Sequence, residues 1–387
     1  MTLKRNSKLF LVLFLGTLSA FGPFVTDLYL PALPTMSSYF NSSTSTIQLT
    51  LTGSMVGLAL GQLLIGPISD KYGRKNPLII SLIVYLISTI AIILFPNVYA
   101  MIVLRFIQGV SSAGAVVISR AISTDLYHGR ELAAFFALLM AVNGLAPILS
   151  PILGSVLLEL TDWRGIFITL ALIGVILLAV SFKFNESLAI EKRLDLPITK
   201  TYYSLVYVVK NRLFFALVIV QGFALAAMFA YIAASPFILQ THYSLSPLMY
   251  SLCFGLNGFA IVLGSKSAGN FKEKVSIKLG LSLMLLVSIY LAVALTLTLP
   301  FLFIEVGFFL LLLGLGFILP AGSAIAMSLE RERAGSASAF FGFVPFFLGG
   351  VVSPLVGIGN IFHSSAIAIV VCSAISFITF KLVEKKI

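Results

Sequence analysis

Three ionisable side chains lie inside long apolar stretches, where charges are rare. Asp27 occurs in FGPFVTDLYLPALP, Arg105 in LRFIQGVSSAG, and Glu305 five residues after Pro300. A charge at the centre of a bilayer costs about 2.5–3.5 kcal/mol on insertion scales, so such residues usually face a protein interior or a water-filled cavity. They also mark ion and proton pathways. These three residues are therefore candidates for proton coupling.

Asp27 lies about 19 residues into the first apolar stretch, so it could instead be solvated at the outer membrane interface. Burial disfavours the charged form of a carboxyl, and a buried Asp27 could bind and release a proton. Gly22, Pro23 and Pro31 interrupt the same stretch. Helix breaks in a membrane are tolerated where protein or water satisfies the freed backbone groups. The breaks agree with a cavity-lining helix, although a kink for packing would also explain them.

Arg105 should face the interior and pair with a neighbour, and Gln108 shares its helix face. Arg105 could act in coupling or only in a structural ion pair, and Glu305 could be solvated at the interface. A soft aromatic cavity with few polar groups would suit varied apolar molecules. The candidates for contacts with such a substrate are Tyr29, Gln108, Asn143, Pro147, Pro151, Phe229, Tyr231 and Asn257.

A compact charged loop, GPISDKYGRK, joins the second and third apolar stretches. Gly66 and Gly73 permit close helix approach and a tight turn. Asp70 can cap a helix end or pair with Arg74. Asp125, at the end of the fourth stretch, could join this charge network. By its residues alone, the loop could equally be a plain basic turn.

The elements that carry these residues are apolar helices. The 387-residue chain is 59% hydrophobic and 10% charged, which is too apolar for a soluble domain. Its apolar runs of about 18–25 residues match the thickness of a bilayer core. We expect an all-α membrane protein with twelve transmembrane helices. The spans are predicted near 8–33, 44–68, 77–95, 99–124, 132–158, 165–182, 211–239, 246–268, 276–298, 300–325, 334–360 and 363–381.

The segment 183–210 is the long charged stretch of the sequence. It predicts a cytoplasmic linker between two pseudo-symmetric six-helix bundles, 1–182 and 211–387. The halves also share a motif, since SPILG begins at Ser150 and SPLVG at Ser353, 203 positions later. Parallel repeats of this kind are typical of transporters with a substrate site near the membrane midplane, at the interface of the halves.

The distribution of charge predicts the topology. The formal net charge is +11, which in a soluble protein could indicate nucleic-acid binding, but here the charges lie in short loops. With the N-terminus in the cytoplasm, all but two of the 25 Lys and Arg residues fall on the cytoplasmic side. The exceptions are Arg164, which falls outside, and Arg105, which falls within a span. This bias predicts that both termini are cytoplasmic and that the number of spans is even. No nucleic-acid partner is expected.

Metal and cofactor chemistry find no support in the sequence. Cys253 and Cys372 lie in apolar runs without a partner spacing, and His128, His242 and His363 fall near loops on different membrane faces. No nucleotide-binding loop with the required spacing occurs. We expect no metal, no cofactor and no enzymatic activity, and active transport would have to draw on an ion gradient.

Several motifs resemble those of a known family. GPISDKYGRK is similar to the loop signature G-x-x-x-D-x-x-G-R-[KR] of the major facilitator superfamily, and RFIQGVSSAGAVVISRAISTDL resembles its fourth-helix motif. GLAPILSPILGSVL resembles the fifth-helix motif of drug/proton antiporters, with Ala146 and Ser155 where glycines are often found. TDLYLPALP, SRAISTDLY, GLAPILSPILG, TDWRGIF, FAYIAASPFILQTHYSLSP and AGSASAFFGF together resemble the bicyclomycin-resistance (Bcr/CflA) family.

The resemblance implies export of bicyclomycin-, chloramphenicol- or sulfonamide-like drugs, driven by inward proton flow. It implies that Asp27 is the first-helix acid and Arg105 the fourth-helix arginine of proton coupling. It also implies a conformational charge relay of Asp70, Arg74 and Asp125. In the expected rocker-switch cycle, the acid is deprotonated when the protein faces inward and loads a proton when it faces outward.

Two other functions remain open. A proton-coupled symporter that takes up a small metabolite would share the fold, although it would be expected to have more polar cavity residues. A membrane sensor or scaffold that transports nothing would need no deep acid. We expect a monomer in the bacterial cytoplasmic (inner) membrane, with protons, a small drug molecule and the lipid bilayer as partners.

Overall fold

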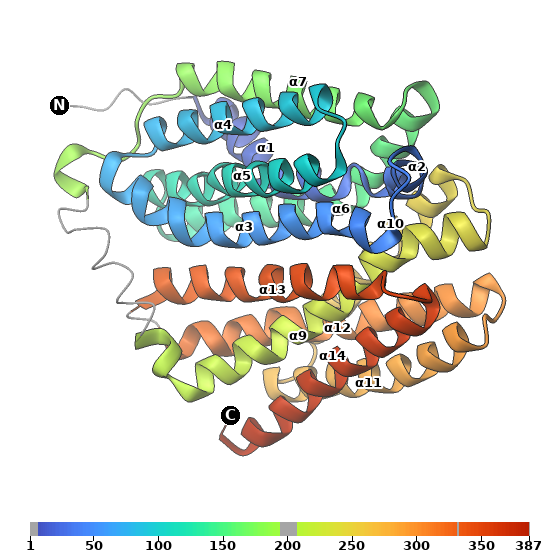
Figure 1. Cartoon of the computed structure of the whole chain (residues 1–387). Helices are drawn as coiled ribbons and strands as arrows, with labels where there is room; N and C mark the ends of the chain where they lie inside the picture. Colours follow the sequence, from blue (N-terminus) through green and yellow to red (C-terminus); the bar gives the residue numbers. More distant parts are fainter. Residues whose placement is uncertain (1–6, 194–206, 331–332, 387) are drawn as a thin grey trace. The chain divides into compact units, whose positions relative to one another are not determined.

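The structure of the protein is a computed structural model that describes residues 7–193, 207–330 and 333–386. All regular elements in these ranges are helices (Figure 1). Twelve helical segments in the described ranges are long and apolar enough to cross a membrane, which confirms the predicted all-α membrane protein. The helices are α1 (Lys8–Asp27), α2 (Leu33–Tyr39), α3 (Thr44–Tyr72), α4 (Lys75–Leu94), α5 (Val98–Leu126), α6 (Gly129–Leu160), α7 (Trp163–Lys183), α9 (Arg212–Pro236), α10 (Pro247–Ala268), α11 (Glu273–Thr296), α12 (Phe301–Leu329), α13 (Ala334–Val356) and α14 (Ile361–Val383).

Polar residues mark where several of these helices begin. The side chains of Asn97, Asp162, Asn211 and Asn360 each accept a hydrogen bond from a backbone N–H in the first turn of the following helix. Such N-caps satisfy donors that have no partner within the helix. The spans predicted from the apolar runs differ from the observed helices by only a few residues at most ends.

The largest departure from the predicted ranges is at the first span, which we expected to run to residue 33. The α-helix α1 ends at Asp27, and a 3₁₀ turn, Leu30–Ala32, leads into α2. The carbonyl of Asp27 would accept a helical hydrogen bond from residue 31, which is a proline and has no N–H. Asp27 is therefore the last residue of its helix.

Contacts group the chain into two compact units. The N-terminal unit comprises Met1–Leu30 and Gly53–Tyr202, and the C-terminal unit comprises Pro31–Thr52 and Tyr203–Ile387. The first turns of α3 thus belong to the C-terminal unit and the rest of α3 to the N-terminal unit. Of the predicted linker 183–210, residues 194–206 lie outside the described ranges.

Prolines leave helix carbonyls without a donor, and in the C-terminal unit hydroxyl groups replace that donor. The carbonyls of Gly316 and Gly350 would accept helical hydrogen bonds from the residues four positions later, which are Pro320 and Pro354 and have no N–H. The Ser265 hydroxyl donates to the Gly316 carbonyl at 3.2 Å, and the Thr52 hydroxyl donates to the Gly350 carbonyl at 2.9 Å. Breaks in membrane helices are tolerated when freed carbonyls find such partners.

Glycines bring the backbones of α3 and α5 into contact in the N-terminal unit. A Cβ atom added at Gly57 would lie 2.2 Å from the Phe106 carbonyl oxygen, and one added at Gly109 would lie 2.2 Å from that of Ser54. Membrane helices gain packing contacts in this way, because small residues let backbones approach closely.

The same kind of contact recurs 203 positions later, the offset that relates the repeated motifs. A Cβ at Gly61 would lie 2.4 Å from the Val110 oxygen on α5, and a Cβ at Gly264 would lie 2.2 Å from the Leu313 oxygen on α12. Both residues of the second pair lie 203 positions beyond those of the first. The internal repeat therefore extends to the packing of matching helices.

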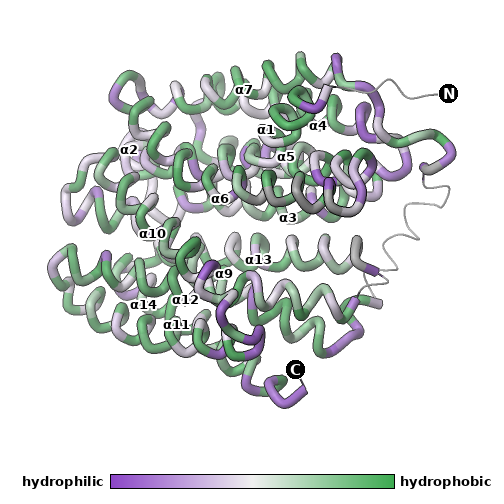
Figure 2. Tube along the Cα trace, turned by 180° about the vertical axis from the view of Figure 1, so that it is seen from behind, coloured by the Kyte–Doolittle hydropathy of each residue, from purple (hydrophilic) through white to green (hydrophobic). Residues whose placement is uncertain are grey.

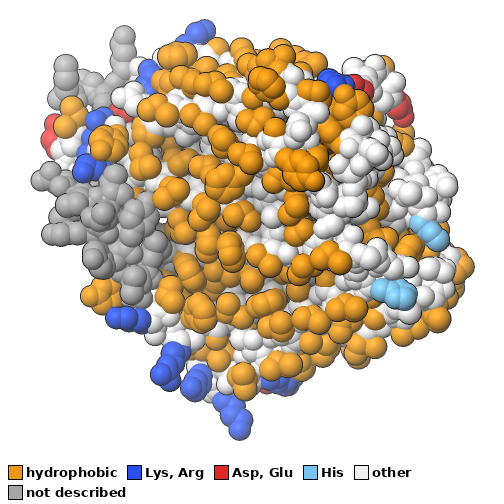
Figure 3. Space-filling view, viewed as in Figure 1, with side chains coloured by type: hydrophobic (Ala, Val, Ile, Leu, Met, Phe, Trp, Pro, Cys, Tyr) orange, Lys and Arg blue, Asp and Glu red, His pale blue; other side chains and the backbone are white. Residues whose placement is uncertain are grey.

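The outer sides of the helices are apolar. Hydrophobic residues run along the helices, whereas hydrophilic residues lie mainly at their ends and in the loops (Figure 2). Large apolar side chains cover much of the face seen in Figure 3. Exposed apolar residues of the described chain include Leu13, Ile87 and Leu286, each more than 60% exposed. Surfaces of this kind are suited to lipid contact, and the chain is a multi-pass membrane protein.

Candidate functional site

Arg105 connects α5 to the end of α1 inside the N-terminal unit. Its side chain is fully buried. Its Nη1 donates hydrogen bonds to the Val25 carbonyl at 2.9 Å and to Gln108 Oε1 at 2.6 Å. The guanidinium lies 4.1 Å from the centre of the Tyr29 ring, a distance typical of a cation–π contact. The structure thus brings together Arg105, a predicted proton-coupling residue, with Gln108 and Tyr29, which are predicted to contact the substrate.

The polar contacts continue from Gln108 into α4. Gln108 Nε2 donates to the Thr89 hydroxyl at 2.7 Å, and Thr89 donates to the Tyr85 carbonyl at 2.7 Å. Phe167 of α7 adds a second ring, 5.7 Å from the guanidinium. Thr89 and Phe167 were not predicted, because nothing in their sequence context distinguishes them from other membrane-helix residues.

Asp27 lies at the edge of this cluster. It is the last residue of α1, it remains partly exposed, and its carboxylate is attracted by the Arg105 charge. Burial among helices disfavours a charged carboxylate, whereas a nearby guanidinium favours it. A partly exposed group under these two opposed influences is suited to exchange a proton.

Glu305 belongs to the C-terminal unit and forms a separate cluster there. Its side chain accepts a hydrogen bond from Asn257 Nδ2 at 3.0 Å, and the same amide donates to the Tyr231 hydroxyl at 3.0 Å. The structure therefore brings together one predicted coupling residue and two residues predicted for the substrate cavity.

The charged loop before α4 forms a third cluster, centred on Arg74, which is only 5% exposed. Arg74 Nε donates to Asp125 Oδ2 at 2.9 Å, and Nη2 donates to Asp125 Oδ1 at 3.2 Å. Arg74 Nη1 contacts Asp70 Oδ1 at 2.5 Å. Gly73 has φ +88°, a conformation that glycine adopts without strain, and this turn directs Arg74 toward both carboxylates.

Charge pairing outweighs desolvation at Arg74. Burial alone would lower the pKa of the guanidinium, but hydrogen bonds and attraction from Asp125 and then Asp70 hold the pKa of Arg74 above its ordinary value. A two-pronged arginine–carboxylate pair is among the stronger polar contacts in proteins. The loop is thus fixed to α5 by Asp125 and to the end of α3 by Asp70.

Glu186, which lies after α7, also belongs to the loop cluster. Its carboxylate accepts hydrogen bonds from the backbone N–H groups of Arg74 at 2.9 Å and Lys75 at 3.1 Å, at the first residues of α4. Arg193 contacts it at 3.7 Å, and Ser187 donates to Asp125 at 2.9 Å. A carboxylate at a helix N-terminus is favoured by the free N–H groups and the helix dipole. No sequence pattern indicated this role of Glu186, because the backbone N–H groups at the start of α4 lie 112 and 111 positions away.

We expect Glu186→Gln to lower the stability of the N-terminal unit by about 1–3 kcal/mol, the usual effect of losing hydrogen bonds to a charged group. Trp163, the single tryptophan, lies buried in this unit, so its fluorescence during thermal unfolding in detergent reports the change. Glu191→Gln, at an exposed position five residues later, is the control. Equal unfolding temperatures for the two variants would contradict the assigned role of Glu186.

Gly66 of α3 also belongs to the loop cluster, because its carbonyl accepts a hydrogen bond from the Ser69 hydroxyl, which in turn accepts one from Arg74 Nη1, both at 2.8 Å. Asn143 of α6 donates to the Ser19 hydroxyl of α1 and to the Leu139 carbonyl. Phe229 packs on Phe346 with ring centres 5.6 Å apart. Pro147 and Pro151 both lie within α6.

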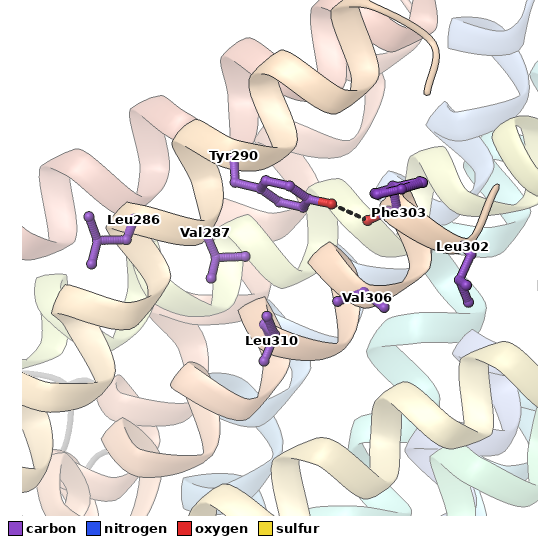
Figure 4. Close-up of a pocket in the computed structure, with 7 residues that line it drawn as sticks. All are labelled: Leu286, Val287, Tyr290, Leu302, Phe303, Val306 and Leu310. Atoms are coloured by element: carbon purple, nitrogen blue, oxygen red, sulfur yellow. Dashed lines mark hydrogen bonds between the residues drawn. The ribbon is translucent and has the colours of Figure 1, made fainter. Parts of the chain in front are cut away.

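An apolar pocket of about 560 Å³ opens between α11 and α12 (Figure 4). Leu and Val side chains line it together with Tyr290 and Phe303, and the Tyr290 hydroxyl donates to the Phe303 carbonyl at 3.0 Å. The pocket presents no charged group, so it offers nothing for ion coupling. Among the residues described, no group of three or more His, Cys, Asp or Glu side chains could hold a metal ion.

Comparisons with known proteins extend over nearly the whole chain. Residues 9–354 match the family model of the Major Facilitator Superfamily. The chain is 36% identical to the uncharacterized MFS-type transporter YdgK of Bacillus subtilis over 92% of this chain and 90% of that protein. It is 28% identical to a bicyclomycin resistance protein homolog of Haemophilus influenzae over 70% and 69% of the two chains. Its fold is similar to that of the xylose transporter XylE of E. coli, with a TM-score of 0.73, 13% identity and coverage of 97% of both chains.

Proposed function

The chain belongs to the major facilitator superfamily, and we propose that it is a proton-coupled antiporter that exports small amphipathic drugs by alternating access. It is a transporter and not an enzyme. The relative in Haemophilus influenzae, described as a bicyclomycin resistance protein homolog, supports a drug as the substrate. Bicyclomycin-, chloramphenicol- and sulfonamide-like molecules are the first compounds to test.

The observation that supports this proposal is the placement of Asp27 within the electrostatic reach of Arg105. The Asp27 carboxyl is partly exposed and is attracted by the charge of the buried Arg105 guanidinium, and ionisable residues inside a membrane usually mark ion or proton pathways. In the proposed cycle, Asp27 binds a proton from outside, which weakens its attraction to Arg105. Release of that proton to the cytoplasm restores the attraction, so the two protonation states favour different arrangements around α1 and α5.

The charged loop is proposed to stabilise one conformation of the cycle. Arg74, Asp70 and Asp125 would form their contacts in one state and lose them in the other, as a bistable element requires. The excess of basic residues at the predicted inner loops supports cytoplasmic termini and a location in the bacterial inner membrane. We propose that the protein works there as a monomer.

The proton gradient is a sufficient energy source for this function. One charge that crosses 100 mV releases about 2.3 kcal/mol. A hundredfold gradient of a neutral drug requires about 2.7 kcal/mol, at about 1.4 kcal/mol per tenfold step. One proton therefore suffices at this potential when a modest pH gradient is added.

Transport by everted membrane vesicles tests the proposal. Vesicles that contain the protein are expected to accumulate one or more of bicyclomycin, chloramphenicol and a sulfonamide when the membrane is energised, and to lose them when an uncoupler is added. Cells that overproduce the protein should become resistant to the same compound. Increased sensitivity of the cells would indicate an uptake symporter, and no change in vesicles or cells would indicate a sensor or scaffold.

A further inference from the structure

Glu305 is deeply buried although it lies one turn from the start of α12. Its side chain is 5% exposed, and its partners Asn257 of α10 and Tyr231 of α9 are 0% and 1% exposed. The amide of Asn257 donates to both of the other two side chains, at 3.0 Å each. The carboxyl is therefore held by three helices of the C-terminal unit rather than solvated at an interface.

Aromatic rings pack around Tyr231, one of the three members of this polar group. The Tyr231 ring lies 4.7 Å from Phe308 and 5.9 Å from Phe254, which in turn lies 6.1 Å from Tyr250. These rings leave little room for bulk water around Glu305. An ionised carboxylate in such surroundings is costly unless a positive group compensates its charge.

In the described part of the chain, no positive group forms an ion pair with Glu305. The ion pairs formed by its residues do not include Glu305. The titratable side chains around it are Tyr231 of α9 and Cys253 of α10, with Tyr250 behind Tyr231. On the neighbouring helix α11, Tyr290 bonds a backbone carbonyl, and α13 contains no titratable residue. Asp27, by contrast, is attracted by the charge of Arg105.

Two oxygen atoms of the cluster lack a hydrogen-bond partner. Among the described residues, Glu305 Oε2 and Asn257 Oδ1 are both buried and have no hydrogen-bond partner at ordinary hydrogen-bonding geometry, and the side-chain donor beside the carboxyl other than Asn257 is the Cys253 thiol, a weak donor. Buried polar atoms are nearly always hydrogen-bonded, so two adjacent exceptions require an explanation. Because both atoms are acceptors, the missing partner must be a donor or a cation. A proton on the carboxyl would remove the charge of Glu305 and turn one of its oxygens into a donor.

The internal repeat shows that Asp27 and Glu305 do not occupy equivalent positions in the two halves. The 203-residue offset places Ala230 at the position of Asp27, and it places Glu305 at the position of Ile102. The two carboxyls are thus not copies of one ancestral site, and they lie in different units of the structure.

We propose that Glu305, held by Asn257 and Tyr231, is a second proton-binding site that takes up and releases its own proton in each export cycle. The proton comes from the outer solution, is carried as the neutral carboxylic acid, and leaves to the cytoplasm. The part of this inference that concerns the export cycle rests on the proposed antiport. The binding of a proton by Glu305 does not, and it can be tested without any drug.

Infrared difference spectra of the purified protein in liposomes, recorded between acidic and alkaline buffer, test proton binding directly. Wild-type protein is expected to show the C=O band of a buried carboxylic acid with two components. Glu305→Gln should remove one component and Asp27→Asn the other. Glu273→Gln, at an exposed position at the start of α11, is the control and should leave both. Glu305→Asp should restore a shifted band, which shows that the carboxyl and not the fold is responsible.

Two results of this experiment would overturn the inference. The first is a Glu305→Gln spectrum identical to that of wild-type protein, because Glu305 would then not titrate. The second is a band that responds to the exchange of choline chloride for sodium chloride at constant pH but not to pH itself. In that case the missing partner of Glu305 Oε2 and Asn257 Oδ1 would be a sodium ion.

The role in the cycle is tested by the limiting chloramphenicol gradient in everted vesicles. The limiting concentration ratio is the drug concentration inside the vesicle divided by that outside when accumulation stops. Its logarithm is proportional to the number of coupled protons, so loss of one of two protons lowers the ratio to about its square root. We expect this for Glu305→Gln and complete loss for the double variant with Asp27→Asn. An unchanged limiting ratio in Glu305→Gln would refute the second coupled proton. Absence of accumulation by wild-type protein for every drug tested would refute the proposed antiport instead, and the infrared result would still decide whether Glu305 binds a proton.

Discussion

Asp27→Asn is expected to remove at least one coupled proton and with it most of the drug gradient. At about 100 mV, the loss of one charge withdraws about 2.3 kcal/mol of driving force, equivalent to a roughly fortyfold smaller limiting gradient. Asparagine has nearly the shape of aspartate but cannot exchange a proton, so the packing at the end of α1 is retained. The limiting gradient in everted vesicles and the drug resistance of producing cells both measure the effect.

Glu159→Gln is the matched control, since Glu159 is an exposed acid near the end of α6 in the same unit. It is expected to keep wild-type resistance and a wild-type gradient. Asp27→Glu keeps a titratable group and should retain part of the activity. If Asp27→Asn exported drugs as well as wild-type protein and still responded to an uncoupler, Asp27 would have no part in coupling.

Gly57→Ala is expected to have the largest effect on stability. The new Cβ atom would lie 2.2 Å from the Phe106 carbonyl oxygen and 2.9 Å from the backbone nitrogen of Val110. Both atoms belong to the backbone of α5, which no change of side-chain rotamer can move. Overpacking of this kind usually costs about 1–3 kcal/mol, and a rigid backbone on both sides favours the upper end of that range. The Trp163 fluorescence of the purified protein during heating reports unfolding of the same unit.

The control for this substitution is Gly144→Ala on α6, where an added Cβ meets nothing within 4 Å. Alanine favours a helix over glycine by about 1 kcal/mol, so this variant should be as stable as wild-type protein or more stable. A Gly57→Ala protein that unfolds at the temperature of Gly144→Ala would show that α3 and α5 are not in backbone contact.

The amino-acid sequence determined the membrane spans, because transfer of a helix into lipid depends on the summed hydropathy of its residues and hardly on its neighbours. It also contained the information that ends α1, since the absence of an N–H at Pro31 is a local property. The predicted span near 8–33 nevertheless runs past this point, whereas α1 ends at Asp27. The grouping of Asp70, Arg74 and Asp125 followed from a resemblance to a known loop, and the structure shows how Gly73 permits it.

Only the tertiary structure decided which of the buried polar residues meet. The contact of Arg105 with the Val25 carbonyl and the Tyr29 ring depends on how α5 is rotated against α1. The triad of Glu305, Asn257 and Tyr231 likewise depends on the packing of three helices. The contact of Glu186, which follows α7, with the first backbone N–H groups of α4 depends on packing in the same way. A hydropathy pattern says that a helix crosses the membrane but not which side of it faces a given neighbour. That choice is made by close packing, where the positions of glycines and the shapes of side chains from distant parts of the chain fit together.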